Sequence, residues 1–217
     1  MYKILLVDDE ILVRDAIREN IDWKSLDCEL VGDCENGRQA VEFVQSHKVD
    51  VVLTDICMPY MDGMELSEFL HDNYPDILIV IFSGFGEFEY AKKAIRYNVS
   101  EYMLKPVTAM ELTKVLRNMK EKLDSRKKKQ KKWMRRIENK KAVPGVWLLT
   151  LPSSQQNNLD VIPADLLLQP AVRRNCPMIV GLAVSREEAF ELCGGDRIGN
   201  LSGNRRSKNP GMAAEPD

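Results

Sequence analysis

The chain has few histidines, no paired cysteine motif and no long apolar run, and each absence excludes a class of protein. Among its 217 residues, no uninterrupted apolar stretch approaches the roughly 18 residues that a membrane helix requires, and the N-terminus lacks a signal-peptide pattern. We therefore expect a cytoplasmic protein with no membrane partner. The five cysteines form no Cys-x-x-Cys pair, and only His47 and His71 accompany them, so a structural zinc site is not expected.

Charge is distributed unevenly along the chain, although the net charge is only −2. Residues 1–124 carry 24 acidic and 14 basic side chains, whereas residues 125–141 carry ten basic and one acidic. Residues 142–217 are nearly balanced, with eight acidic and seven basic. This partition predicts an acidic folded domain at 1–124, a basic linker at 125–141 and a separate tail at 142–217.

Four short apolar runs each end in a charged or hydroxyl-bearing residue. The runs are rich in Val and Ile and are separated by segments with helical periodicity, which is typical of buried parallel strands. Because the carboxyl ends of parallel strands lie along one edge of a sheet, we expect the residues that follow them to share a pocket. The runs and their following residues are Tyr2–Val7 before Asp8 and Asp9, Val49–Thr54 before Asp55, Ile77–Phe82 before Ser83, and Glu101–Leu104 before Lys105.

The order of strands and helices predicts the fold. A further strand is expected at Cys28–Gly32, and helical patterns occur at 11–21, 40–44, 64–70 and 88–95. Strands that alternate with helices favour a parallel sheet covered on both faces. We therefore expect an α/β fold, a flavodoxin-like (βα)5 doubly wound parallel sheet with strand order 2-1-3-4-5, within residues 1–124.

The last helical pattern of this domain continues into the basic linker. Apolar residues at alternating steps of four and three run from Leu112 to Leu123, and the same spacing reaches Ile137. Arg126 and Gln130 occupy this stripe in its second half, so it is a poor coiled-coil seam. We expect a solvated basic helix, and we favour this over direct contact of the linker with DNA phosphates, which such a run also permits.

The tail contains seven of the ten prolines and a polar run at Ser153–Asn158. Met178–Val184 followed by Arg186–Leu192 fits one strand and one helix. The end of the chain has the glycine, serine, asparagine and proline content of a disordered segment. The tail stays unassigned, and disordered, truncated and non-native origins are all open interpretations.

The residues at the strand ends suit phosphoryl chemistry. Three clustered carboxylates repel one another and need a counter-cation, and Mg²⁺ prefers oxygen ligands and keeps sites for phosphate oxygens. Lys105 adds a positive charge and Ser83 a hydrogen-bond donor for a phosphoryl group. A carboxylate such as Asp55 can then act as a nucleophile toward phosphorus and form an aspartyl phosphate.

Other enzyme classes fit the pattern less well. A haloacid-dehalogenase-type phosphatase needs a second acid two residues after its nucleophile, and Cys57 stands there. A nucleotide-binding enzyme would have a glycine-rich loop after the first strand, but Asp8-Asp9-Glu10 would repel phosphates. Neither histidine lies near a strand end, so a serine or cysteine triad is not indicated.

The spacing of these residues resembles the receiver domain of bacterial two-component response regulators. The matching features are Asp8-Asp9, Asp55 followed by Met58-Pro59 and Asp62-Gly63, Ser83-Gly84, and Tyr102 before Lys105-Pro106. The resemblance covers about residues 1–124. It implies a phosphoacceptor switch, with no enzyme activity beyond its own phosphotransfer and slow autodephosphorylation, that receives a phosphoryl group on Asp55 from a sensor histidine kinase.

The same resemblance implies a role for each site residue. Mg²⁺ would be bound by Asp9, Asp55 and the backbone carbonyl of Cys57, with Asp8 acting through a water. Ser83 and the Gly84 amide would bind phosphoryl oxygens and Lys105 would pair with them. The Lys105-Pro106 bond would be cis, and Tyr102 would change rotamer with Ser83.

The implied output is transcriptional. Ile21-Asp22-Trp23 and the segment 83–91 are similar to receivers fused to AraC-type DNA-binding domains, which implies DNA binding by the native full-length protein. The tail departs from that pattern, so a stand-alone or truncated receiver that acts through protein contacts is the alternative. A homodimer through the fourth helix, fifth strand and fifth helix is also implied. In this family the residue two past the phosphoacceptor and the residue two past the switch hydroxyl influence the attacking water. Here these are Cys57 and Phe85, neither of which orients water well, so the resemblance implies slow hydrolysis of the phosphoryl group.

Overall fold

Five parallel strands form one sheet in the order β2-β1-β3-β4-β5, which confirms the predicted flavodoxin-like topology. The strands are β1 (Tyr2–Val7), β2 (Cys28–Cys34), β3 (Val51–Asp55), β4 (Leu78–Ser83) and β5 (Glu101–Leu104). Every residue of β3 and β4 is buried. Both faces of these central strands are covered, and this is why they are continuous apolar runs without alternating polar residues.

The computed structural model describes residues 1–84, 97–153 and 159–194. The chain divides into two units, Met1–Val143 and Pro144–Asp217. The helix expected at 88–95 lies outside the described residues.

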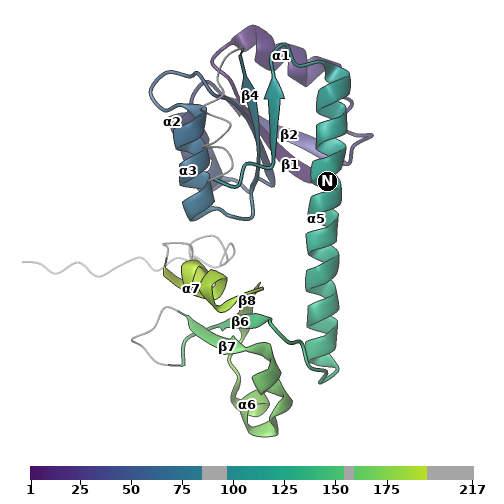
Figure 1. The fold of residues 1–217 in the computed structure, drawn as a ribbon, viewed down its shortest axis with the longest axis vertical. Helices are drawn as coiled ribbons and strands as arrows, with labels where there is room; N and C mark the ends of the chain where they lie inside the picture. Colours follow the sequence, from purple (N-terminus) through teal and green to yellow (C-terminus); the bar gives the residue numbers. More distant parts are fainter. Residues whose placement is uncertain (85–96, 154–158, 195–217) are drawn as a thin grey trace, which may run out of the picture. The chain divides into compact units, whose positions relative to one another are not determined.

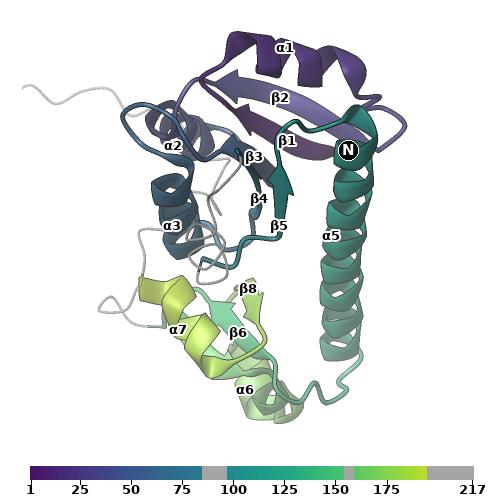
Figure 2. The same cartoon turned by 45° about the horizontal axis from the view of Figure 1, so that its top comes forward.

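Two hydrophobic layers cover the sheet of the first unit. Alternate residues of β1 face opposite layers: Leu5 and Val7 belong to the layer with α2 and α3, and Ile4 and Leu6 to the layer with α5 and Ile17 of α1. The helices are α1 (Ile11–Asn20), α2 (Gly37–Ser46), α3 (Gly63–Asn73) and α5 (Ala109–Glu138). Figure 1 shows the sheet between these helices, and Figure 2 shows α5 along one side of the sheet with α2 and α3 on the other.

The strand bounds differ from the apolar runs at two places. β3 begins at Val51 and not at Val49, and Asp50 just before it bonds with Lys3: the Lys3 amide donates to Asp50 Oδ2 and the Asp50 amide donates to the Lys3 carbonyl, both at 2.8 Å. β2 continues past Gly32 to Cys34, because Asp33 and Cys34 still pair with the last residues of β1.

Helix α5 is a single helix of 30 residues, as its periodic stripe predicted. It begins at a capping box in which the Thr108 side chain accepts from the Glu111 amide and the Glu111 side chain accepts from the Thr108 amide. Its apolar stripe is buried from Leu112 to Leu123, whereas every residue from 125 to 132 is exposed. The helix therefore packs on the sheet along its first half and is solvated where the basic run begins.

The second unit has its own three-stranded antiparallel sheet, in the order β7-β6-β8. Its elements are β6 (Trp147–Thr150), β7 (Asp160–Pro163), a 3₁₀ turn (Ala164–Leu168), α6 (Pro170–Asn175), β8 (Ile179–Ala183) and α7 (Arg186–Gly194). The strand and helix expected over Met178–Leu192 are confirmed as β8 and α7. Disorder, one interpretation of the tail, therefore does not apply to these elements.

Across the described parts of both units, no helix combines the length and the apolar character needed to cross a membrane.

Tyr2 joins the start of the sheet to the middle of α5. Its side chain is buried, and its hydroxyl donates a hydrogen bond to Asp124 Oδ1 at 2.6 Å. The ammonium group of Lys127 lies 3.9 Å from the centre of the Tyr2 ring, within the range of a cation–π interaction. Burial, with the neighbouring Asp124 carboxylate, raises the pKa of Tyr2 well above its ordinary value of 10.0.

Replacing Tyr2 with Phe is expected to lower the free energy of unfolding by about 1 kcal/mol at neutral pH, because one hydrogen bond to a carboxylate is lost. The raised pKa keeps the folded phenol protonated above pH 10.0, where the unfolded phenol ionises, so wild-type stability falls as the pH rises further. Urea unfolding at neutral pH and at about pH 10.5 should show that Tyr2→Phe removes part of this fall. Tyr60→Phe, at an exposed tyrosine, is the control and should change neither quantity.

Candidate functional site

The carboxyl ends of β1, β3 and β4 and the residue after β5 meet at one edge of the sheet. The register aligns Val7 with Thr54, Asp55 with Phe82, and Ser83 with Leu104. Lys105, the next residue, places its Nζ atom 2.9 Å from Asp55 Oδ1 and 3.1 Å from Asp8 Oδ2. The structure thus brings together two of the three predicted carboxylates and the predicted lysine.

Asp8 is fully buried, and two donors contact its carboxylate. The Glu10 amide donates to Oδ1 at 2.9 Å and Lys105 donates to Oδ2. Burial raises the pKa of Asp8 above its usual value, and the contacts with Glu10 and Lys105 oppose that rise without cancelling it. The ionised form of Asp8 is therefore less favourable in the folded protein than in water.

Lys105 balances part of this negative charge. Burial by itself would lower the pKa of Lys105, but hydrogen bonds to Asp55 and Asp8 outweigh burial and raise it, so the ammonium form is the favoured one. Glu10 Oε1 lies 3.9 Å from the same nitrogen. The peptide bond between Lys105 and Pro106 is cis, as the resemblance implied.

Asp55 ends β3 and its side chain is 9% exposed. The start of α3 packs directly on its backbone: a Cβ atom added to Gly63 would collide with the Asp55 carbonyl oxygen, so this position needs glycine. Asp62 begins the helix by accepting from the amides of Met64 and Glu65 in a capping box. The Asp62-Gly63 pair therefore fixes the loop that follows Asp55.

Ser83 is buried at the end of β4, one residue after Phe82, which pairs with Asp55, and its hydroxyl donates to the Gly84 carbonyl at 2.9 Å. Tyr102 on β5 is half-buried and packs against the apolar layer that includes Ile81. Asp9 and Cys57 are both exposed, on the loops that follow β1 and β3. The predicted residues thus occupy one edge, but the Asp9 side chain lies outside the buried group formed by Asp8, Asp55 and Lys105.

The side chains present have the chemistry of a Mg²⁺ site. Asp8, Asp9, Glu10 and Asp55 supply four carboxylates at this edge, against the single ammonium group of Lys105, and oxygen donors with excess negative charge suit a hard dication. Over the residues that the structure describes, no three acidic, histidine or cysteine side chains are gathered as a metal cluster. The donor set therefore fits the ion, while the ligand geometry stays a prediction.

The structure adds a residue that the sequence interpretation missed. Arg14 on α1 is buried, and its Nη1 donates to the backbone carbonyl of Asp8. Its Nε donates to Asp33 Oδ2 at 2.9 Å. No signal in the sequence separates Arg14 from Arg18, which follows one turn later on the same helix and is exposed.

An apolar groove of about 600 Å³ opens next to the site. Leu12, Val13 and Ile17 of α1 form one wall, and Lys105 and Pro106 lie on the other. Leu12 is 79% exposed at its rim. Lys105 therefore belongs both to the groove and to the carboxylate cluster.

Comparison with known proteins agrees with this fold and identifies the family. Residues 4–117 match the family model of the response regulator receiver domain, so the chain belongs to that family. Its receiver domain is a signalling component of a two-component system rather than a classical enzyme.

Two of the similar proteins are named as transcriptional regulatory proteins. The chain is 43% identical over 112 residues to the uncharacterized transcriptional regulatory protein YesN of Bacillus subtilis, covering 52% of this chain and 30% of that protein. It is 32% identical over 117 residues to the transcriptional regulatory protein HptR of Staphylococcus aureus, covering 54% and 45%. The chain thus covers less than half the length of these relatives.

Solved structures agree in fold. The receiver domain of AraT, a response regulator from Geobacillus stearothermophilus, is 39% identical with a TM-score of 0.56, covering 58% of this chain and 98% of that one. A two-component transcriptional regulator AraC from Clostridium phytofermentans is 34% identical with a TM-score of 0.54, covering 58% and 97%.

Replacing Asp8 with Asn is expected to stabilise the protein when no divalent cation is present. Burial raises the pKa of Asp8 and so disfavours its charged form, and the substitution removes that charge. A gain of ~1 kcal/mol in the free energy of unfolding would increase the melting temperature by about 3 °C. Calorimetry in a chelating buffer measures this change. Asp72→Asn, on the exposed face of α3, should leave the melting temperature unchanged. A lower melting temperature for Asp8→Asn would mean that the contacts with Lys105 and Glu10 outweigh burial.

Proposed function

We propose that the protein is a response regulator whose Asp55 accepts a phosphoryl group from a phosphohistidine of a sensor histidine kinase and which controls transcription. The observation that carries this proposal is the contact of Lys105 with both Asp55 and Asp8 at the common edge of three strands. A strand-end carboxylate held beside an ammonium group is arranged to receive a phosphoryl group and to neutralise the charge it brings.

In the transfer, an oxygen of the Asp55 carboxylate donates an electron pair to phosphorus while the bond from phosphorus to the histidine nitrogen breaks. The electron pair of the broken bond stays with the imidazole, and an acyl phosphate remains on Asp55. Lys105 already contacts this carboxylate and pairs with the phosphoryl oxygens. Mg²⁺ held by Asp8, Asp9, Asp55 and the Cys57 carbonyl would supply further positive charge to those oxygens.

The groove between α1 and Lys105 gives the kinase a place to bind. It is apolar along Leu12, Val13 and Ile17, and this suits the apolar face of an amphipathic helix. Because Lys105 lies in the groove wall and within 2.9 Å of Asp55, a helix bound there brings its phosphohistidine close to the acceptor. A kinase that draws its phosphoryl group from ATP also places the protein in the cytoplasm.

Phosphorylation adds about −1.5 to −2 charge at Asp55. The Ser83 hydroxyl turns from the Gly84 carbonyl toward the new oxygens, and Tyr102 moves inward on the neighbouring strand. This changes the surface around β5 and α5, where we propose that two copies dimerise. The fourth helix of that surface lies outside the described residues, and so does Phe85. The residue types at Cys57 and Phe85 are the basis of the proposed slow dephosphorylation.

The output has two candidate forms. Relatives named as transcriptional regulators support control of transcription, with a receiver at 1–124, a basic linker at 125–141 and an output region beyond. In the described part of the second unit, helices α6 and α7 are separated by strand β8, and no pair of successive helices resembles a helix-turn-helix. The second candidate is a receiver that acts through protein contacts.

The test is phosphorylation of the full chain by acetyl phosphate with Mg²⁺. We expect the wild-type protein to gain the mass of one phosphoryl group, which hydroxylamine removes because the linkage is an acyl phosphate. Asp55→Asn should gain none, whereas Asp72→Asn should behave as wild type. Intact-protein mass spectrometry measures the addition. Equal phosphorylation of Asp55→Asn and wild type would refute the proposed acceptor.

A further inference from the structure

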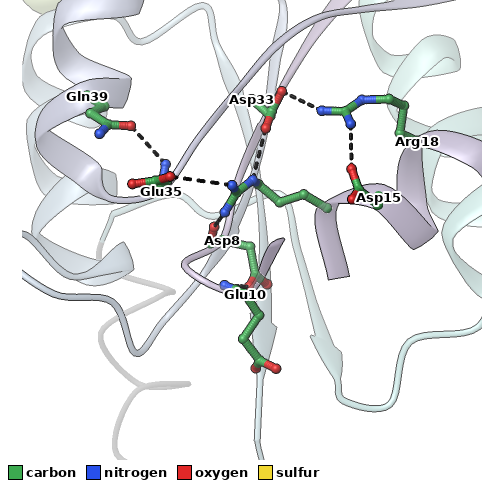
Figure 3. A network of polar contacts seen from close by, with 8 residues as sticks. Asp8, Glu10, Asp15, Arg18, Asp33, Glu35 and Gln39 are labelled. Atoms are coloured by element: carbon green, nitrogen blue, oxygen red, sulfur yellow. Dashed lines mark hydrogen bonds and ion pairs between the residues drawn. The ribbon is translucent and has the colours of Figure 1, made fainter. Parts of the chain in front are cut away.

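A buried arginine lies behind the acidic loop of the acceptor site. The side chain of Arg14 is only 6% exposed and contacts three acceptors: the Asp8 carbonyl, Asp33 at 2.9 Å and Glu35 at 3.7 Å. The dashed lines that meet between Asp8, Asp33 and Glu35 in Figure 3 are these contacts. Its guanidinium group therefore joins the loop after β1 to the end of β2.

This contact fixes the backbone of the loop and not its carboxylates. The Asp8 amide donates to the Cys34 carbonyl at 3.1 Å, and the Asp8 carbonyl accepts from Arg14, so both peptide groups next to Asp8 are held. The Arg14 amide also donates to the Glu10 carbonyl. The three residues from Asp8 to Glu10 are thus bound at both ends, with Asp9 between them.

Asp33 pairs with two arginines of α1 through separate oxygens. Asp33 accepts from Arg14 through Oδ2 and from Arg18 through Oδ1, the latter at 2.6 Å. Arg18 in turn pairs with Asp15 at 2.6 Å. A planar guanidinium group spreads its donors over three nitrogens in a fixed arrangement, whereas lysine has a single nitrogen, so Arg14 can contact a carbonyl and two carboxylates in different directions.

We propose that Arg14 is a positioning residue that sets the affinity of the site for a divalent cation, by holding the loop that carries Asp8 and Asp9. The inference rests on the proposed function, in which these carboxylates bind Mg²⁺. Mg²⁺ requires nearly octahedral geometry with short oxygen distances, so a loop that shifts by a fraction of an ångström loses affinity. A polar group behind the ligands can change metal affinity about 10–100-fold.

A simple charge effect would act in the opposite direction. Arg14 is a cation beside an acidic site, so by Coulomb's law its removal should strengthen the binding of another cation. The positioning role predicts that its removal weakens that binding. Arg18 is the matched control, because it carries the same charge and shares Asp33 but lies outside the loop and is 44% exposed.

The experiment is a calorimetric titration of the full chain with Mg²⁺. We expect Arg14→Met to bind Mg²⁺ about tenfold more weakly than wild type. Arg14→Lys keeps the charge but loses the fork of donors, and we expect about threefold weaker binding. Arg18→Met should bind as tightly as wild type or slightly more tightly. Urea unfolding without Mg²⁺ establishes that each variant is folded.

Phosphorylation by acetyl phosphate over a range of Mg²⁺ concentrations gives a second measurement. In Arg14→Met the Mg²⁺ concentration for half-maximal rate should rise about tenfold, while the rate at saturating Mg²⁺ stays within about twofold of wild type. A general loss of structure would instead lower the rate at saturation.

Two results would overturn the proposal. One is Mg²⁺ binding by Arg14→Met that equals or exceeds that of wild type, and the other is an equal change in Arg14→Met and Arg18→Met. If Arg14→Met does not fold, the proposal is overturned when Arg14→Lys binds Mg²⁺ with the wild-type affinity. A wild-type chain that binds no Mg²⁺ and accepts no phosphoryl group would refute the proposed function itself, so the two failures are distinguishable.

Discussion

One ammonium group between two carboxylates is the interaction on which the site depends. Asp8 follows β1, Asp55 ends β3 and Lys105 follows β5, so three separate strands contribute to a single charged cluster. Two carboxylates this close repel each other when both are charged, and the ammonium group between them offsets part of that repulsion. The apolar layers that bury the strands thereby also set the positions of the charges. Because negative charge still exceeds positive charge, the site is stabilised further by any cation that can reach it.

The strands and the strand-end residues could be predicted because both follow from simple periodicity. Buried parallel strands are continuous apolar runs, and their carboxyl ends share one edge, so Asp55, Ser83 and Lys105 could be placed together without coordinates. The exact strand ends could not be predicted, since contacts such as the bond from the Lys3 amide to the Asp50 side chain are not visible in a run of apolar residues. The position of the Asp9 side chain relative to Asp8 and Asp55 could not be predicted, because it depends on the path of the short loop after β1.

Other features depend on contacts between segments far apart in the chain. Arg14 is a charged residue in an amphipathic helix, where an arginine is ordinarily solvated. Its burial is explained by Asp33, which β2 brings next to the helix. Gly63 is an ordinary helix-start glycine until the Asp55 carbonyl is seen to occupy the space of a side chain. The sheet of the second unit pairs short strands through β6, and proline-rich sequence gave little indication of that pairing.

The unbroken length of α5 has a mechanical consequence. Thirty residues at about 1.5 Å each make a rod of about 45 Å, and its backbone hydrogen bonds leave no hinge between the half that packs on the sheet and the half that carries the lysines. The hydrogen bond from Tyr2 to Asp124 secures this rod near its middle. A twist or tilt imposed on α5 beside the carboxylate cluster therefore reaches its far end as a displacement that grows with distance, without any change in the linker itself.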